Sequence, residues 1–265
     1  MDLCLRGKTA IVAAASKGLG KAVAQAFAAE GANVVMFSRD QAAIEAAASQ
    51  VQAGAAQGVQ VVPVQADVTR PDDLARVVSS TLNRFSSLHI LYNNAGGPKP
   101  GVFDTLSDED WLYAVDLNLL SAIRLTRLCL PAMRRQRWGR IITGTSSSVK
   151  QPLPTLMLSN SIRSATTAWA KTLADQVAAD GITVNTLAPG RIDTERVRQI
   201  DEDAAERSGR SREEVEREAL KTIPLGRYGQ PAEFGAAAAF LASEQAAYIT
   251  GVTLLVDGGL FRGTY

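Results

Sequence analysis

The feature that most constrains the fold is a regular alternation of short apolar runs with longer amphipathic segments along the whole chain. The apolar runs are rich in Val, Ile and Leu, which is typical of parallel strands covered on both faces. The segments between them have helical spacing, so consecutive strands are joined by helical crossovers. Strands are predicted at Lys8–Ala13, Ala32–Phe37, Val59–Gln65, Leu88–Tyr92, Arg140–Thr143, Ile182–Leu187 and Val252–Val256.

The helices predicted between these strands complete a chain of βαβ units. The simplest arrangement is an α/β fold with a single Rossmann-type, doubly wound parallel sheet of about seven strands, flanked by helices. No repeat or low-complexity linker divides residues 1–265, so we expect one domain. Helices are predicted at Gly18–Glu30, Gln41–Gln52, from Pro71 onward, and at Asp108–Arg134, Thr155–Ala179 and Pro231–Ala242.

The segment 191–222 departs from this rhythm, because it is long and highly charged. One interpretation is a pair of solvated surface helices. The other is a lid over a cleft, since the segment follows the sixth strand, where the carboxyl end of a strand meets a ligand. We favour the substrate lid.

Charge and cysteine content exclude several classes of protein. The formal net charge is +1, from 28 basic and 27 acidic residues. That balance argues against a nucleic-acid or membrane-surface partner, which would require a basic excess. Two cysteines without a CxxC pair, and one histidine, argue against a disulfide framework and a His/Cys metal site. We find no secretory signal and no apolar run of about 18 residues, and expect a cytoplasmic protein without a membrane span.

The first junction between a strand and a helix has the composition of a phosphate-binding loop. Glycines in such a loop let the backbone approach a pyrophosphate, and the helix N-terminus supplies N–H donors. The alternative is a helix start whose glycines serve close packing, since Ala14 stands where the pattern has its first glycine. The candidate cofactor-binding residues here are Ser16, Lys17, Gly18, Leu19 and Gly20.

Several further motifs follow in order, and together they carry a resemblance. Asp67-Val68 follows the third strand, Asn93-Asn94-Ala95-Gly96 follows the fourth, and Asn118 lies in a long helix. Asn185 to Gly190 reads NTLAPG, and Val256 to Gly259 reads VDGG. Over essentially its whole length the chain resembles the short-chain dehydrogenase/reductase family, most closely its 3-oxoacyl-carrier-protein reductase-like branch.

The resemblance implies a role for each motif. Asp67 would bond the adenine amino group, and Val68 would flank the adenine with a main-chain contact. The ribose and pyrophosphate would lie against Asn94, Ala95 and Gly96. The nicotinamide end would be held by Pro189, Gly190, Ile192 and Thr194.

The resemblance also implies a small-molecule substrate and a homotetramer. The helices predicted at Asp108–Arg134 and Thr155–Ala179 carry apolar positions on more than one face. One face covers the sheet, and a second apolar face requires another partner. The alternative is a monomer that tolerates an Ala-rich outer face.

The end of the second strand allows a physical argument about the cofactor. NAD favours a carboxylate there, which grips the ribose 2′-hydroxyl, whereas NADP favours cations for the 2′-phosphate. This chain has the neutral Ser38, followed by Arg39, with Lys17 in the glycine loop across the same pocket. We therefore expect NADP(H) to be favoured over NAD(H).

The catalytic motif is where the chain departs from the family that it resembles. That family uses a Ser and a YxxxK pair, helped by an Asn, and the motif after the fifth strand places its Ser at Ser146. The Tyr and Lys then fall on Ser159 and Arg163, one helical turn apart. None of the five tyrosines lies between positions 114 and 227, so no shift of alignment restores the pair. The candidate catalytic residues are Asn118, Ser146, Ser159 and Arg163, with Arg163 also expected to bind the cofactor.

Three functions remain open on this basis. The leading hypothesis is reduction of a ketone by hydride transfer, with the proton given by Ser159, or by a water that Ser146, Ser159 and Asn118 hold. An aliphatic hydroxyl is a poorer proton relay than a phenol, and Arg163 stays protonated where a lysine can shuttle. The alternatives are a non-redox or imine-directed enzyme and a nucleotide-binding protein without turnover. Tyr92 is expected to face the core or the cofactor floor.

Overall fold

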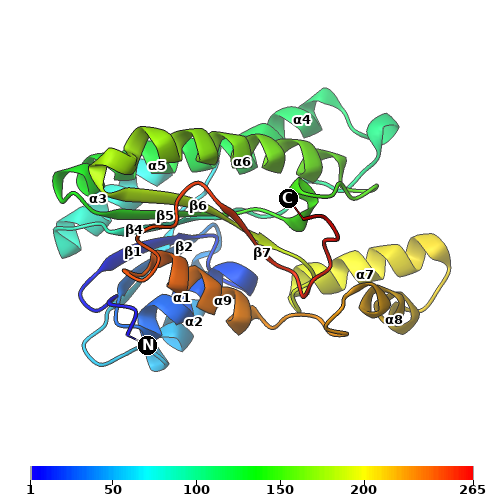
Figure 1. Cartoon of the computed structure of the whole chain (residues 1–265), viewed down its shortest axis with the longest axis horizontal. Helices are drawn as coiled ribbons and strands as arrows, with labels where there is room; N and C mark the ends of the chain where they lie inside the picture. Colours follow the sequence, from blue (N-terminus) through cyan, green and yellow to red (C-terminus); the bar gives the residue numbers. More distant parts are fainter. Residues whose placement is uncertain (1, 265) are drawn as a thin grey trace.

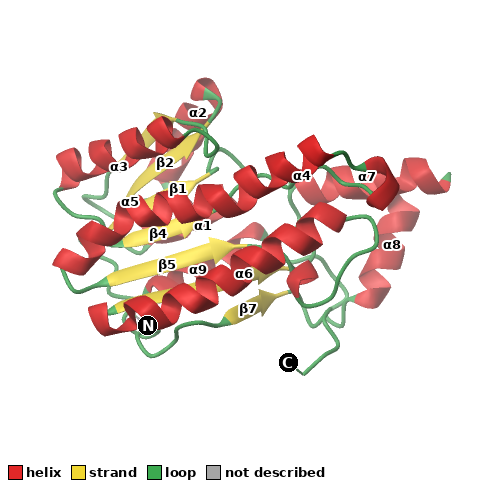
Figure 2. Ribbon diagram, turned by 90° about the horizontal axis from the view of Figure 1, so that it is seen from above, coloured by secondary structure: helices red, strands yellow, loops and turns green. Residues whose placement is uncertain are grey.

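The computed structural model of the chain describes residues 2–264. Seven parallel strands form one sheet in the order β3-β2-β1-β4-β5-β6-β7 (Figure 2), which confirms the predicted Rossmann-type sheet. The strands are β1 (Thr9–Ala13), β2 (Asn33–Ser38), β3 (Val61–Gln65), β4 (Ile90–Asn93), β5 (Gly139–Gly144), β6 (Ile182–Pro189) and β7 (Thr253–Val256).

Helices cover both faces of the sheet (Figure 1), so its five inner strands are almost wholly buried, whereas the outer strands β3 and β7 are partly exposed. On one face lie α1 (Gly18–Ala29), α2 (Gln41–Ala53) and α9 (Pro231–Ala242). On the other lie α3 (Pro71–Phe85), α5 (Ser121–Arg135) and α6 (Met157–Val177). Two apolar clusters, one for each face, hold the layers together. Among the residues described, no helix is long and apolar enough to cross a bilayer.

The order of the strands in the sheet determines where a ligand can bind. The chain runs from β1 outward to β3, then returns to the other side of β1 with β4. At this reversal the loops that leave β1 and β4 part to opposite faces, which opens a crevice at the carboxyl ends of the strands. The motifs singled out from the sequence lie at this edge.

The long helix expected over Asp108–Arg134 is interrupted, which corrects the sequence prediction. The structure has α4 (Asp108–Ala114), a π-helical segment (Val115–Leu120) and then α5. A π-helical turn contains one extra residue, so it hardly alters the apolar pattern from which the helix was predicted. The segment contains Asn118, whose backbone carbonyl accepts a hydrogen bond from Thr166 Oγ1 of α6 at 3.3 Å. Such segments are frequent at functional sites.

The charged segment 191–222 folds into α7 (Glu195–Ser208) and α8 (Arg212–Thr222) beyond the carboxyl edge of the sheet (Figure 1). Its base is fixed by the buried carboxylate of Asp201 on α7. That carboxylate accepts from the Tyr228 hydroxyl at 2.9 Å and pairs with Arg191. No residue of α8 is buried, so the two helices are attached mainly through α7.

Candidate active site

The glycine loop between β1 and α1 is shaped for close approach of a ligand. Ala14 has a φ of +50°, the left-handed region that favours glycine. A Cβ on Gly20 would lie 2.4 Å from the carbonyl oxygen of Ala14, so only glycine fits there. Lys17 is the N-cap of α1, and its side chain caps no N–H group. The first N–H groups of α1 are therefore free to bind a phosphate.

The start of α7 closes over this loop from the other side. Thr194 caps α7 through its hydroxyl, and its side chain lies 3.8 Å from the Cβ position of Gly18. Next to it, Glu195 pairs with Lys17, with 2.5 Å between the carboxylate and Nζ. Lys17 was expected from the sequence to be a cation without an opposing acid, and Glu195 corrects that expectation, because it is distant in sequence but adjacent in the fold.

The end of β2 presents Arg39 to solvent. Arg39 forms no ion pair with any residue in the described part of the chain, and its carbonyl accepts from Gln65 Nε2 at 3.1 Å. The Ser38 hydroxyl donates to the carbonyl of Asp40, whose carboxylate caps α2. The carboxylate of Asp40 thus accepts a hydrogen bond at the N-terminus of α2, and Arg39 is a cation without an ion pair in the described chain at the end of β2.

Two loops at the crevice are fixed by their own side chains. Asp67 Oδ1 accepts from the backbone and the hydroxyl of Thr69, which leaves Oδ2 for another donor. In the loop after β4, Asn94 Nδ2 donates to the carbonyl of Ala13 at 3.3 Å. The carbonyl of Gly96 accepts from Asn118 Nδ2 at 3.0 Å. The π-helical segment therefore holds the loop that follows β4.

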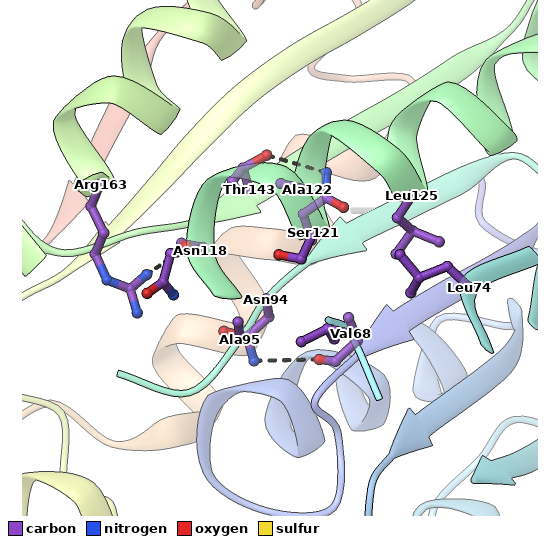
Figure 3. Close-up of a pocket in the computed structure, with 13 residues that line it drawn as sticks. Val68, Leu74, Asn94, Ala95, Asn118, Ser121, Ala122, Leu125, Thr143 and Arg163 are labelled. Atoms are coloured by element: carbon purple, nitrogen blue, oxygen red, sulfur yellow. Dashed lines mark hydrogen bonds between the residues drawn. The ribbon is translucent and has the colours of Figure 1, made fainter. Parts of the chain in front are cut away.

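A pocket opens between these loops and α5 and α6 (Figure 3). The Arg163 guanidinium lies beside the Asn118 amide at one end, and Leu74 and Leu125 line the other. Asn118 is 6% exposed, and its Oδ1 has no hydrogen-bond partner within residues 2–264. Five predicted site residues line this pocket: Val68, Asn94, Ala95, Asn118 and Arg163.

Arg163 carries a buried charge that has no carboxylate partner within residues 2–264. It is 8% exposed, and its Nη1 donates to the carbonyl of Gly144 at 3.1 Å. Burial lowers the pKa of Arg163 to about 10, with smaller contributions from Tyr92, which raises it, and from Arg196, which lowers it further. The guanidinium stays protonated at neutral pH, so it presents a cation to anything bound in the pocket.

The two candidate serines lie outside the pocket lining. Ser146 caps the short turn Ser147–Val149, where its Oγ accepts from Ser148 N at 3.1 Å. Its own O–H proton remains available to another acceptor. Ser159 on α6 is 7% exposed, and its hydroxyl bonds to no other described residue. Ser159 and Arg163 share a face of α6, since they are four residues apart.

The loop after β6 contains the remaining predicted residues. A Cβ on Gly190 would lie 2.6 Å from the Cβ of Asp257, so the backbone at Gly190 requires glycine. Pro189 ends β6, and Ile192 is buried against Gly229. These residues lead directly to Thr194 and the start of α7.

Besides Glu195, sequence reasoning missed two features of this site, the position of Arg196 and the bond between Gly144 and Arg163. Arg196 of α7 reaches the loop after β4, where its Nη2 lies 3.2 Å from the Cβ position of Gly97. Gly144 at the end of β5 bonds Arg163 through its carbonyl, and Tyr92 lies directly beside Gly144. Gly144, the second glycine of the run GRIITG, was the one available signal, since glycine inside a strand often marks a close approach.

Comparison with known proteins identifies the family. The sequence family described as enoyl-(acyl carrier protein) reductase matches residues 13–261. A 3-oxoacyl-[acyl-carrier-protein] reductase from Synechocystis sp. is 34% identical over 258 residues, 97% of this chain and 98% of that protein. The chain belongs to the short-chain dehydrogenase/reductase family. It is therefore an oxidoreductase of the kind that acts on carbonyl or hydroxyl groups.

Solved structures of this family extend the likeness to three dimensions. L-sorbose reductase from Gluconobacter frateurii, complexed with NADPH and L-sorbose, superposes with a TM-score of 0.93 at 32% identity. The match covers 99% of this chain and all of that one. A 7α-hydroxysteroid dehydrogenase complexed with NADH has a TM-score of 0.89 at 30% identity, over 97% and 96% of the two chains. Relatives thus bind either nicotinamide cofactor.

Proposed function

We propose that this chain is an NADP(H)-dependent reductase of a small ketone. The observation that carries the proposal is the buried Arg163, which has no carboxylate partner within residues 2–264. It lies at one end of a pocket also lined by Ala13, the last residue of the strand that leads to the uncapped N-terminus of α1. A dinucleotide suits this combination, because its pyrophosphate matches the free N–H groups and its ribose hydroxyls match a guanidinium.

The residues present fit such a cofactor along its whole length. In this proposal Asp67 and Val68 bind the adenine, Ser38 and Arg39 the adenosine ribose, and Ser16 to Gly20 the pyrophosphate. Asn94, Ala95 and Gly96 would also contact the ribose and the pyrophosphate. When bound, NADPH supplies a hydride from nicotinamide C4. The nicotinamide end of the cofactor would be held by Arg163, Pro189, Gly190, Ile192 and Thr194.

Ser159 and Arg163 stand where the family motif has its Tyr and Lys, and we propose that they form an atypical proton relay. Ser146 orients the substrate carbonyl through its free O–H proton. Ser159, or a water that it holds with Asn118, gives the proton to the developing alkoxide. Arg163 places a positive charge beside that oxygen, which stabilises the charge that forms in the transition state.

A panel assay tests the reductase against its alternatives. NADPH is mixed with the protein and a set of ketones, aldehydes and imines, and its oxidation is followed by absorbance. Oxidation with ketones supports the proposal, and oxidation with imines alone identifies an imine-directed enzyme. NADPH binding by fluorescence without oxidation by any substrate would identify a binding protein without turnover.

The cofactor preference gives a first prediction. We expect the wild-type protein to bind NADPH more tightly than NADH, since Arg39 is a free cation without an opposing acid at the end of β2. Lys17 contributes less, because Glu195 shares its charge. Arg39→Ala should weaken NADPH binding about 3- to 10-fold and leave NADH unchanged, a modest effect because the site is exposed to solvent.

Titration of both cofactors by intrinsic fluorescence measures this difference. Arg135→Ala is the matched control, since Arg135 is an exposed arginine on α5 without an ion pair in the described chain. Glu195→Gln removes the ion pair with Lys17 and should therefore strengthen NADPH binding, the opposite of the effect of Arg39→Ala. Equal affinities of the wild-type protein for NADPH and NADH would contradict the expected preference for NADPH.

The quaternary structure gives a second prediction, a homotetramer. Apolar side chains are exposed beside β7 and α9, among them Tyr248 and Leu254, and on α4, where Leu112 and Tyr113 face solvent. Two separate apolar surfaces on one chain suit an assembly with two kinds of contact. Light scattering at micromolar concentration should give the mass of four chains, and Leu254→Glu should lower it. A monomeric mass for the wild-type protein would contradict the assembly.

We also propose that residues 191–222 act as a lid over the substrate. A separate proposal is that the protein works in the cytoplasm. Support for the lid comes from the contacts of Thr194 with Gly18 and of Glu195 with Lys17, which connect α7 to the glycine loop across the crevice. Support for the compartment comes from the cysteines, because Cys4 and Cys129 are both unpaired thiols.

A further inference from the structure

An arginine at the start of α7 is a cation without a partner in the described chain. Arg196 is exposed, and its guanidinium forms no ion pair with any of residues 2–264. The acids close to it in the sequence do not neutralise it, because each of them pairs with another cation. These pairs are Asp193 with Arg198, Glu195 with Lys17, and Asp201 with Arg191.

The place of Arg196 on its helix is also unfavourable for a cation. The N-terminus of a helix carries a partial positive charge from its free N–H groups, which favours acids there and basic residues at the other end. Arg196 is the second residue of α7, whereas Arg207 lies in the last turn, where a cation is favoured. A conflict of this kind is expected at a functional site. A bound anion would resolve both the conflict and the lack of a partner.

The guanidinium of Arg196 lies against the loop that follows β4. Its Nη2 is 3.2 Å and its Nε 3.3 Å from the Cβ position of Gly97, so glycine there leaves room for the guanidinium. The preceding residue, Gly96, accepts from Asn118 Nδ2 at 3.0 Å. Asn118 in turn lies beside the Arg163 guanidinium in the pocket (Figure 3). Two cations without carboxylate partners in the described chain, one from α6 and one from α7, thus lie close to the same short loop.

These two guanidinium groups are close enough to repel each other. Burial lowers the pKa of Arg163, and the charge of Arg196 lowers it further. Two like charges that nothing neutralises disfavour each other's charged form. Arg163 is 8% exposed, whereas Arg196 is open to solvent, so an anion that enters the cleft can reach Arg196 without any rearrangement of the protein.

We propose that the ketone reduced by this protein carries an anionic group, a carboxylate or a phosphate, and that Arg196 binds this group at the mouth of the cleft. The inference rests on the proposed function and names its substrate class. A planar guanidinium can donate two parallel hydrogen bonds to either anion. Arg196 is then a specificity-determining residue, while Arg163 lies at the carbonyl end of the same substrate. Because Arg196 belongs to residues 191–222, the substrate anion would also hold the proposed lid against the loop after β4.

The pyrophosphate of the cofactor is the other anion that this cleft would hold. In the proposed function the free N–H groups of α1 and the glycine loop bind that pyrophosphate. Arg196 lies instead at Gly97, the residue after the stretch that would contact the ribose and the pyrophosphate. This position favours the substrate as the partner of Arg196, and the cofactor affinity of a variant distinguishes the two anions.

Pairs of ketones that differ only in charge test the inference. NADPH oxidation is followed with 2-, 3- and 4-oxo acids against their methyl esters, and with dihydroxyacetone phosphate against dihydroxyacetone. In at least one pair we expect kcat/KM of the wild-type protein to be about 5- to 20-fold higher for the anion, the size of a charge-assisted bond at an exposed site. Arg196→Gln should raise KM for that anion and bring the ratio within the pair close to one. Arg207→Gln, an exposed arginine at the other end of α7, is the matched control and should keep the ratio.

Each other outcome overturns the inference. Reduction of ketones with equal kcat/KM within every pair would refute the anionic substrate and leave the proposed reductase standing. Equal losses for both members of a pair in Arg196→Gln would show that the arginine serves the fold of α7, and a weaker Kd for NADPH would show that its partner is the cofactor. Arg196→Lys keeps the charge and should give an intermediate ratio, which provides the comparison if glutamine disturbs the helix. No NADPH oxidation with any ketone would refute the proposed function as well.

Discussion

Arg163→Ala is expected to weaken NADPH binding about 10- to 100-fold and to lower kcat/KM at least as much. A hydrogen bond to a charged group contributes about 1.5–3 kcal/mol, and Arg163 is buried where water screens it little. The same side chain is proposed to bind the ribose and to stabilise the alkoxide, so binding and turnover fall together. Calorimetric titration and steady-state kinetics measure the two losses.

Two variants control for the loss of packing. Arg163→Lys keeps the charge while it loses the planar fork that donates to Gly144, so it should retain more affinity than alanine. Arg135→Ala removes an exposed arginine and should change neither quantity. Full affinity and full turnover in Arg163→Ala would show that the centre of the site lies elsewhere.

The sheet was predictable from the sequence because its signals are local. Seven apolar runs bounded by helical segments fix a parallel sheet, and each strand appears within two residues of its expected start. The break at Val115–Leu120 was not predictable, because one extra residue in a π-helical turn leaves the apolar spacing almost intact.

The site was predictable where a motif marks the backbone and not where side chains meet from distant segments. Ala14 stands where the pattern has glycine, and the backbone there is left-handed all the same, so the loop keeps its shape despite the side chain. The pairing of Lys17 with Glu195 joins residues far apart in the sequence. The fit of Tyr92 into the space at Gly144 likewise depends on the register of β4 and β5, which no short pattern reports.

Ser159→Ala is expected to lower kcat about 100-fold and to leave the Kd for NADPH nearly unchanged. Removing a positioned proton donor costs about 10²- to 10⁴-fold, and the lower part of that range applies because a water can replace part of the relay. The Ser159 hydroxyl bonds to no other described residue, so its removal leaves no protein group unsatisfied. A loss in kcat without a loss in binding is the signature of an interaction made in the transition state.

The proton relay itself is read from the solvent isotope effect and from a gain-of-function variant. If Ser159 passes the proton, the slower step in Ser159→Ala should show a larger effect of D₂O on kcat than the wild-type protein does. Ser159→Tyr combined with Arg163→Lys supplies a phenol with a pKa near 10 beside a lysine, and should raise ketone reduction above wild type. Ser164→Ala removes a solvent-exposed hydroxyl on the same helix and serves as the control. Undiminished kcat in both Ser159→Ala and Arg163→Ala would show that neither of these two residues of α6 takes part in the proton transfer, and would refute the proposed relay.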